Sequence, residues 1–181
     1  MATEQKSVYK RGADDGLFFG IYLIIMFFAS AFSMAIPFAG LLSMLLVLGV
    51  PFLIYRFLRR SYVNDSGTTQ FSALWVQGIT TFFCGSLISG IAALVYMQWV
   101  NPDFIVNQVQ SLIDVYMATD WTEGKEIAKV LTKMIEQNLL PTPINIVIES
   151  IWLAVITGSI LSMILSIVVQ ARKIKNNNFN L

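Results

Sequence analysis

The sequence predicts an all-α membrane protein, a polytopic bundle of four transmembrane helices with an extracytoplasmic helical insertion between spans three and four. Three observations favour this fold class. The chain of 181 residues is 56% hydrophobic and only 13% charged, which is too apolar for a soluble domain of this size. Long uncharged stretches recur along it, and lysine and arginine cluster in alternate segments between them, which puts the clusters on one side of the membrane.

The first two spans come from one long uncharged stretch. No charged residue lies between Leu17 and Arg56. As a single helix this stretch would be about 60 Å long at ~1.5 Å per residue, roughly twice the ~30 Å hydrocarbon core of a bilayer. We therefore expect two spans, at 17–36 and 39–58.

Proline and glycine mark the break between these spans. In "IPFAG", Pro37 lacks a backbone donor and Gly40 loosens the chain. Pro51 lies inside the second span, where we expect a kink that neighbouring helices tolerate.

Two further apolar stretches complete the set of spans. The third covers 72–99, with Trp75, Tyr96 and Trp99 near its ends as interfacial aromatics. The expected organisation is a cytoplasmic N-terminus at 1–16, transmembrane spans one to three at 17–100, an extracytoplasmic amphipathic insertion at 101–143, a fourth transmembrane span at 144–170 and a basic cytoplasmic tail at 171–181.

Lysine and arginine predict the orientation. With four spans, one side of the membrane carries Lys6, Lys10, Arg11, Arg56, Arg59, Arg60, Arg172, Lys173 and Lys175, and the other carries only Lys125, Lys129 and Lys133. The positive-inside rule then places both termini in the cytoplasm. Asp14 and Asp15 lie at the same boundary as these arginines. One interpretation is that these aspartates form ion pairs with the arginines. The interpretation we favour is that the charges at this boundary only set the orientation.

The insertion is predicted to contain two amphipathic helices. Asn101 is the expected N-cap of the first and Pro102 its first helical residue. In the second, Asp120 and Glu123 approximate a capping box. The apolar stripe of the first helix consists of Val109, Leu112, Ile113, Tyr116 and Met117. The apolar stripe of the second helix consists of Ile127, Val130, Leu131, Met134, Ile135 and Leu139, and three lysines lie outside it.

These stripes need to be buried against something. The helices can pack on each other and on the outer mouth of the bundle, lie in the headgroup region, or bind a partner protein. We favour packing on each other and on the bundle. The loop carries six acids and three lysines, a balance too mild to predict a ligand.

Small residues at four-residue spacing predict where helices pack. Gly16 and Gly20 open the first span. The third carries Gly85, Ser89 and Ala93, and the fourth carries Ala154, Gly158, Ser162 and Ser166. Such spacing lets helix backbones approach closely, so we expect spans three and four to pack together.

Glu149 is the one acid inside a span. It lies about 9 Å from the helix start at Pro143 by helix rise. An acid costs around 3 kcal/mol at the centre of a span and less toward an interface. Asn145 lies one turn earlier and Gln98 lies at similar depth on span three, so these three residues form the candidate polar site.

Two readings of this site stay open. An acid within a membrane span is by default a functional hypothesis, here transport or proton handling. The alternative is a hydrated interfacial carboxylate, which we favour because no second acid or buried cation continues a relay. Gln77, Thr80 and Thr81 are the only polar side chains of any reach in the inner half of span three.

Several classes of chemistry have no support in the sequence. The chain has no histidine and a single cysteine, Cys84, inside an apolar run, so histidine-based catalysis and the usual zinc sites are excluded. No nucleophile–base pair, metal cluster or phosphate-binding glycine loop is present. The net charge of +1 indicates no nucleic-acid partner. We expect no enzyme activity, no metal and no cofactor.

The order of motifs resembles a known family. A charged N-terminus leads into "DDGLFFGIYL"; Phe71 and Trp75 follow span two; a glycine- and serine-rich third span precedes "VNPDF"; a charged helical segment and a last span with a basic tail follow. Over nearly its whole length the chain resembles the bacterial membrane-protein family called domain of unknown function 4199. The resemblance implies a multi-pass protein of the bacterial inner membrane with four spans, and it brings no activity or catalytic residues.

Two functions follow as hypotheses. The leading one is a non-enzymatic scaffold that binds a membrane or periplasmic protein, or a second copy of the chain, through its insertion. The alternative is a small transporter or channel component that uses the polar site around Glu149. In both, the lipid bilayer is the first partner of the chain.

Overall fold

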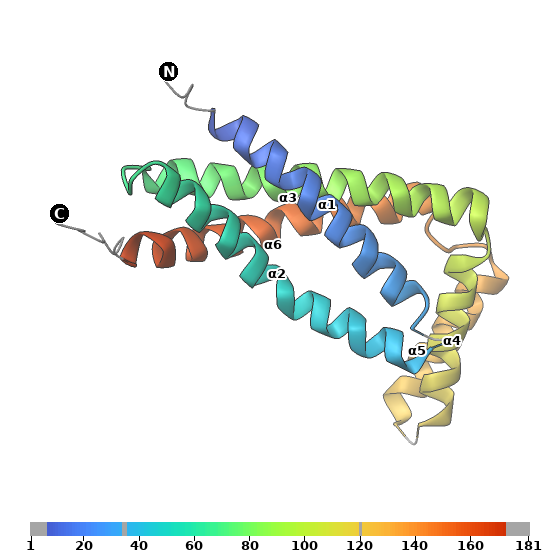
Figure 1. The fold of residues 1–181 in the computed structure, drawn as a ribbon. Helices are drawn as coiled ribbons and strands as arrows, with labels where there is room; N and C mark the ends of the chain where they lie inside the picture. Colours follow the sequence, from blue (N-terminus) through green and yellow to red (C-terminus); the bar gives the residue numbers. More distant parts are fainter. Residues whose placement is uncertain (1–6, 34–35, 120, 173–181) are drawn as a thin grey trace, which may run out of the picture. The chain divides into compact units, whose positions relative to one another are not determined.

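The computed structural model describes residues 7–33, 36–119 and 121–172. The elements in these ranges are all helices, and no strand occurs among the described residues (Figure 1). They are α1 (Val8–Ala31), α2 (Pro37–Asn64), α3 (Phe71–Val95), the short π-helix η1 (Tyr96–Val100), α4 (Phe104–Ala118), α5 (Thr122–Glu136) and α6 (Pro143–Ala171).

Four of these helices are long and apolar enough to cross a membrane. They are Val8–Ala31, Phe38–Asn64, Phe71–Val100 and Pro143–Ala171. The prediction of four such helices is confirmed. The helices extend beyond the predicted spans: α1 begins at Val8 rather than near residue 17, and α2 continues to Asn64 rather than ending near residue 58. Hydropathy finds the apolar part of a span, whereas the backbone stays helical into the polar flanks.

The described helices belong to two compact units. One comprises Met1–Ser89 with Ser150–Leu181, and the other is Gly90–Glu149. The first contains α1, α2 and most of α3 and α6. The second contains α4 and α5, together with the adjoining ends of α3 and α6, so the predicted insertion at 101–143 falls wholly within it.

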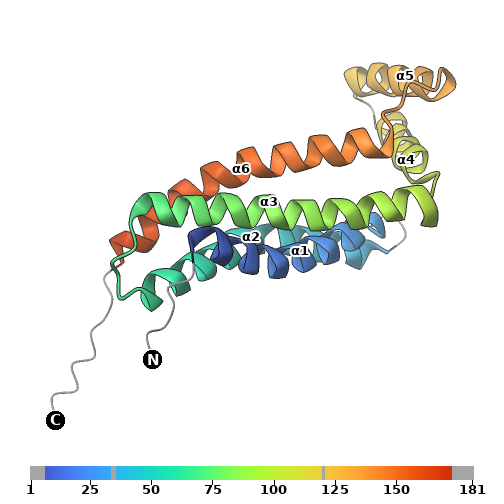
Figure 2. The ribbon, with the colours of Figure 1, turned by 90° about the horizontal axis from the view of Figure 1, so that it is seen from above.

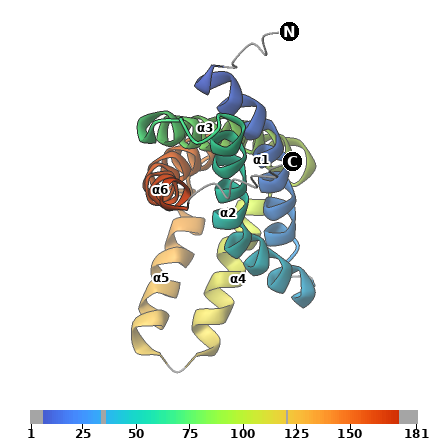
Figure 3. The same ribbon diagram turned by 60° about the vertical axis from the view of Figure 1, so that its left-hand side comes forward.

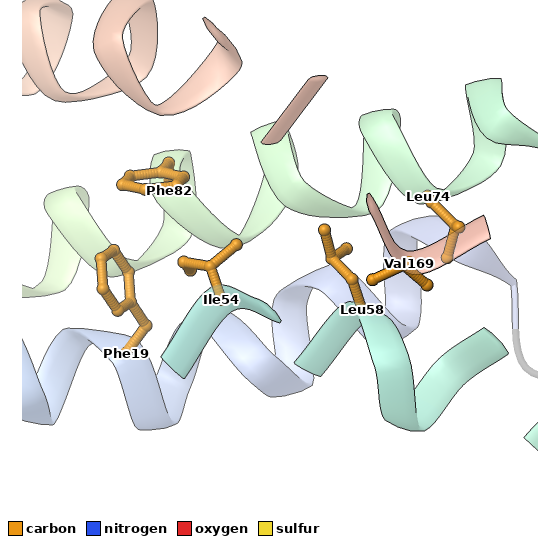
Figure 4. Close-up of a cluster of buried hydrophobic side chains, with 6 residues drawn as sticks. All are labelled: Phe19, Ile54, Leu58, Leu74, Phe82 and Val169. Carbon is orange, nitrogen blue, oxygen red and sulfur yellow. The ribbon is translucent and has the colours of Figure 1, made fainter. Parts of the chain in front are cut away.

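The core of the first unit draws on all four long helices. Figure 2 shows α3 alongside α6, with α1 and α2 on the other side of α3. Six buried apolar side chains form one cluster (Figure 4): Phe19, Ile54, Leu58, Leu74, Phe82 and Val169. The rings of Phe19 and Phe82 meet edge to face, with centroids 4.9 Å apart, a favoured aromatic geometry.

Glycine lets α1 approach α3 closely. A Cβ added at Gly16 would lie 2.6 Å from Cys84 Cβ and 3.2 Å from the carbonyl oxygen of Thr81. A Cβ added at Gly85 would lie 2.6 Å from Phe19 Cδ1 and 3.3 Å from the carbonyl oxygen of Gly16. These distances leave no room for a side chain, so the two backbones meet through glycine.

A second set of small residues lies between α3 and α6. Gly78 faces the side chain of Ser162, and Gly158 faces the ring of Phe82. The indole nitrogen of Trp75 donates to the carbonyl oxygen of Ser159 at 3.1 Å. Of the small residues predicted to join spans three and four, Gly158 and Ser162 therefore face α3.

The other members of that predicted set differ in their surroundings. Gly85 lies against α1 rather than α6. The hydroxyl of Ser89 donates within its own helix, to Ser86 O at 3.2 Å. Ala93 is buried and Ala154 is half-buried.

The second unit contains a helical hairpin of α4 and α5 (Figure 3). Its buried side chains include Ile113 on α4 and Ala128 on α5. The rings of Tyr116 and Trp121 meet at the tip with centroids 5.9 Å apart. Each helix thus buries part of its apolar stripe against the other, as expected for two short amphipathic helices.

The predicted helix starts in this unit need one correction. Pro102 does not begin α4. The N–H of Phe104 donates to the carbonyl oxygen of Asn101 at 3.1 Å, so a turn precedes the helix and Asp103 occupies the N-cap position. Asp120, one half of the expected capping box, lies outside the described residues. The second helix begins at Thr122, which Trp121 precedes as N-cap residue without a side-chain hydrogen bond.

Gly16→Ala should destabilise the protein, because its Cβ would overlap Cys84 Cβ and press on a carbonyl that belongs to the backbone of α3. Overpacking of this kind costs about 1–3 kcal/mol. The thermal unfolding midpoint of the purified protein in detergent measures the effect.

The matched control is Gly40→Ala in α2. Among the described residues, the nearest atom to a Cβ at Gly40 is Ser33 Cβ, at 3.5 Å. This substitution should be neutral or stabilising by up to ~1 kcal/mol, because alanine favours helix over glycine. Equal midpoints for the two variants would contradict the close approach of α1 and α3.

Candidate functional site

The predicted polar site around Glu149 lies in the second unit. Gln98 is in η1, and Asn145 and Glu149 are one turn apart on α6. All three side chains are exposed in the described chain. No hydrogen bond joins them among the residues that the structure describes. The geometry therefore leaves this site as a prediction.

A buried polar cluster in the first unit joins three helices. Gln77 on α3 is 1% exposed. Its Nε2 donates to Asp15 Oδ2 of α1 at 2.8 Å and to Ser61 Oγ of α2 at 2.8 Å. One amide group thus uses both of its hydrogens to bind two other helices.

The hydroxyl of Thr81 strengthens the same seam. Thr81 is also 1% exposed, and its Oγ1 lies 2.9 Å from Gln77 O and 3.3 Å from Gly12 O. A Cβ at Gly12 would lie 2.7 Å from Thr80 Cβ. The absence of a side chain at Gly12 is therefore what brings a backbone acceptor of α1 within reach of the α3 hydroxyl.

An ion pair holds the start of α1 to the end of α2. Arg11 donates from Nη1 to Asp65 Oδ2 at 2.6 Å and from Nη2 to Asp65 Oδ1 at 2.9 Å. Thr69 Oγ1 donates to the same carboxylate at 2.7 Å. This two-pronged geometry is the strongest that arginine and a carboxylate form.

The ion pairs considered from the sequence concern other acids, Asp14 and Asp15. Asp15 accepts a hydrogen bond from Gln77 and lies within electrostatic range of Arg60 and Arg11. The acid that pairs with Arg11 is Asp65, in the turn after α2, which sequence analysis did not single out. The sequence signal that could have pointed to Asp65 was its position at the end of a span, with a threonine, Thr69, four residues later.

Ser162 has the one buried side-chain oxygen without a hydrogen-bond partner in the described part of the chain. It lies on α6 against Gly78, fully covered. The neighbouring hydroxyl of Ser166 donates to Ser162 O at 2.7 Å. Small hydroxyl residues allow α6 to approach α3 closely, and we assign Ser162 that packing role.

The chemistry available to these groups is limited. Among the described residues no group of three His, Cys, Asp or Glu side chains could hold a metal ion. The polar atoms of the buried cluster bind one another across helices. This arrangement fits stabilisation of the fold, because polar groups in a bilayer must find partners within the protein.

The fold defines the class of protein. A bundle containing four helices with the length and apolarity of membrane spans, held together by glycine contacts and internally paired polar groups, is an α-helical membrane protein. The chain belongs to the family described as protein of unknown function DUF4199, whose model matches residues 14–171. The resemblance drawn from the sequence is thereby confirmed. No curated protein and no solved structure matches the chain.

Gln77→Leu should destabilise the bundle by about 1–3 kcal/mol, because it removes the donor shared by Asp15 and Ser61 and leaves both acceptors without it. Unfolding in detergent, followed by circular dichroism, measures the loss.

Two further variants sharpen this test. Gln110→Leu makes the same change at an exposed position of α4 and should stay within ~0.5 kcal/mol of the parent. Asp15→Leu combined with Gln77→Leu should recover part of the stability, because the stranded acceptor is removed. If Gln77→Leu proves as harmless as Gln110→Leu, the cluster does not hold the helices together.

Proposed function

We propose that the protein is a non-enzymatic membrane scaffold that binds a partner protein through the α4–α5 hairpin. In this proposal the hairpin lies outside the cytoplasm, both termini lie inside it, and the membrane is the bacterial inner membrane. The observation that carries the proposal is an apolar flank of the hairpin that the described chain leaves exposed.

This flank is clearest on α5. The seam with α4 uses one side of the helix, on which Gly124 and Ala128 are buried and Leu131 and Ile135 half-buried. At 100° per residue, Ile127, Val130 and Met134 lie on the adjacent side. Ile127 is 40% and Val130 58% exposed. The apolar stripe of α5 is therefore wider than the hairpin needs.

The hairpin also exposes apolar residues on α4. Leu112, Val115 and Met117 are each more than two-fifths exposed, as is Trp121 at the tip. Ile127 and Val130 adjoin each other on one side of α5, and contiguous exposed apolar side chains are typical of an interaction site. Single exposed apolar residues would carry no such meaning.

The charges on α5 favour a protein over a membrane surface as the partner. Interfacial helices that bind anionic headgroups carry an excess of lysine and arginine on the polar face. Here Glu123, Glu126 and Glu136 balance Lys125, Lys129 and Lys133. A neutral polar face beside an apolar flank supports binding of a protein segment with an apolar surface.

The orientation rests on the basic residues. Helix directions bring the start of α1 beside the end of α2, as the Arg11–Asp65 ion pair requires, and Arg59 of α2 reaches the end of α6. Arg11, Arg59 and Arg172 thus lie at one end of the first unit. The positive-inside rule supports a cytoplasmic location for this end.

Reporter fusions test the orientation. A fluorescent protein that matures only in the cytoplasm should report after residues 63 and 181, and alkaline phosphatase should be active after residue 120. A cytoplasmic signal from the fusion at residue 120 would overturn the proposed orientation and remove the hairpin from the outer side.

Photocrosslinking tests the partner site. A photoreactive side chain at Val130 of the full-length protein in living cells should form a crosslink to one other protein, identified by mass spectrometry. The same group at Lys129, one position away on the polar face, should form little. The product at Val130 should be lost when Ile127→Ser is added, because that change removes part of the apolar flank.

The possible results separate the alternatives. Equal crosslinking from Val130 and Lys129 would mean non-specific proximity and would contradict a docking surface. Crosslinks to lipid alone would place the flank in the headgroup region. Crosslinks to a second copy alone would replace the partner by self-association.

A further inference from the structure

Two arginines from distant parts of the sequence meet at one end of the first unit. Arg59 Nη1 of α2 donates to Arg172 O at 2.7 Å and to Val169 O at 3.1 Å. Arg172, just after α6, donates from Nη1 to the hydroxyl of Tyr55 at 3.2 Å, with its guanidinium 5.7 Å from the centre of that ring. The fold therefore holds both cations on the same seam between α2 and α6.

A third arginine lies beside them on α2. Arg56 is exposed and three residues from Arg59, so the two are neighbours on the helix surface. We call Arg56, Arg59 and Arg172 the arginine cluster. Asp15 lies within electrostatic range of Arg60 and Arg11, and Asp65 binds Arg11. Among the described residues, neither Arg56 nor Arg172 is paired with an acid.

Part of this arrangement has a purely structural explanation. Arg59 satisfies carbonyl groups at the C-terminal end of α6, where a cation is favoured by the helix dipole. That explains Arg59 alone. It does not explain why Arg172 is directed onto Tyr55, one turn from Arg59, or why Arg56 adds a third positive charge. Like charges close together repel, and an anion held between them offsets that repulsion.

We propose that the arginine cluster binds the headgroup of an anionic phospholipid. A phosphodiester oxygen pair accepts the fork of N–H donors that a guanidinium presents. Arg56 and Arg172 are the two members with exposed side chains, so they supply these donors. Tyr55 orients Arg172, and Arg59 fixes the backbone of Arg172 at the site.

Exposed apolar side chains beside the cluster identify the anion as a lipid rather than free phosphate. Phe52 lies one turn before Arg56 and is 76% exposed. Ile167 and Val168 lie one turn before Arg172 on α6 and are also exposed. These residues lie toward the apolar part of the two helices, where an acyl chain would extend from a headgroup held by the arginines.

Native mass spectrometry of the full-length, delipidated protein in detergent tests the proposal with two probes, dioleoylphosphatidylglycerol and dioleoylphosphatidylcholine. The parent should retain the anionic lipid in preference to the zwitterionic one. Arg56→Gln combined with Arg172→Gln should weaken retention of the anionic lipid about 10- to 30-fold, because each arginine at a membrane surface contributes roughly five-fold in affinity. Lys10→Gln removes a charge at the same end, outside the cluster, and should change retention less than about five-fold.

The lysine variant separates charge from packing. Arg56→Lys combined with Arg172→Lys keeps both charges but loses the fork of donors, so its retention of the anionic lipid should lie between that of the parent and that of the glutamine variant. Equal losses in the lysine and glutamine variants would mean that the two positive charges contribute nothing to binding and would overturn the proposal. So would equal retention of the two lipids by the parent, or displacement of the anionic lipid by an equal concentration of inorganic phosphate.

Discussion

The contact between α1 and α3 is the constraint on which the rest of the first unit depends. Glycine at positions 12, 16 and 85 lets the two backbones approach until no Cβ fits between them. At that separation Gly12 O comes within reach of Thr81, and Asp15 comes within reach of Gln77. A larger side chain on this seam would separate the helices and strand the polar groups. In a bilayer no water replaces a lost partner, so tight packing and polar pairing must form together.

The sequence predicts the number of long apolar helices because hydropathy and charge are local properties. Four helices of spanning length were expected, and the described part of the chain contains four. The polar partners were not predictable in the same way. Gln77 stood out as a polar residue in an apolar stretch, but its binding to Asp15 and Ser61 depends on which helices are neighbours and how they are rotated. Glycine spacing indicates that close packing occurs, yet it does not choose the partner: Gly85 lies against α1, although its spacing was read as a contact with the last span.

The hairpin shows the same division between local and non-local information. Its apolar periodicity predicts two helices, which form α4 and α5. The start of α4 differs from the prediction because Asn101 and Pro102 enter a turn closed by a backbone hydrogen bond, a choice that cap preferences alone do not decide. The width of the α5 stripe was visible in the sequence. The part of this stripe that is buried depends on how α4 packs against α5. The packing of α4 therefore determines which apolar residues of α5 stay exposed.

Burial is distributed unevenly among the four long helices, and this relates the fold to its surroundings. About a third of the most apolar window of α1 and of α3 is buried, against 11% for α2 and 17% for α6. The apolar windows of α2 and α6 are therefore less covered by the protein than those of α1 and α3, as membrane spans require of their lipid-facing sides. The arginine cluster lies where these same two helices end. Acyl chains that cover α2 and α6 would thus bring their headgroups to Arg56 and Arg172. The uncovered apolar surface and the position of the two arginines therefore follow from one arrangement of helices, in which α1 and α3 pack tightly and α2 and α6 stay less covered.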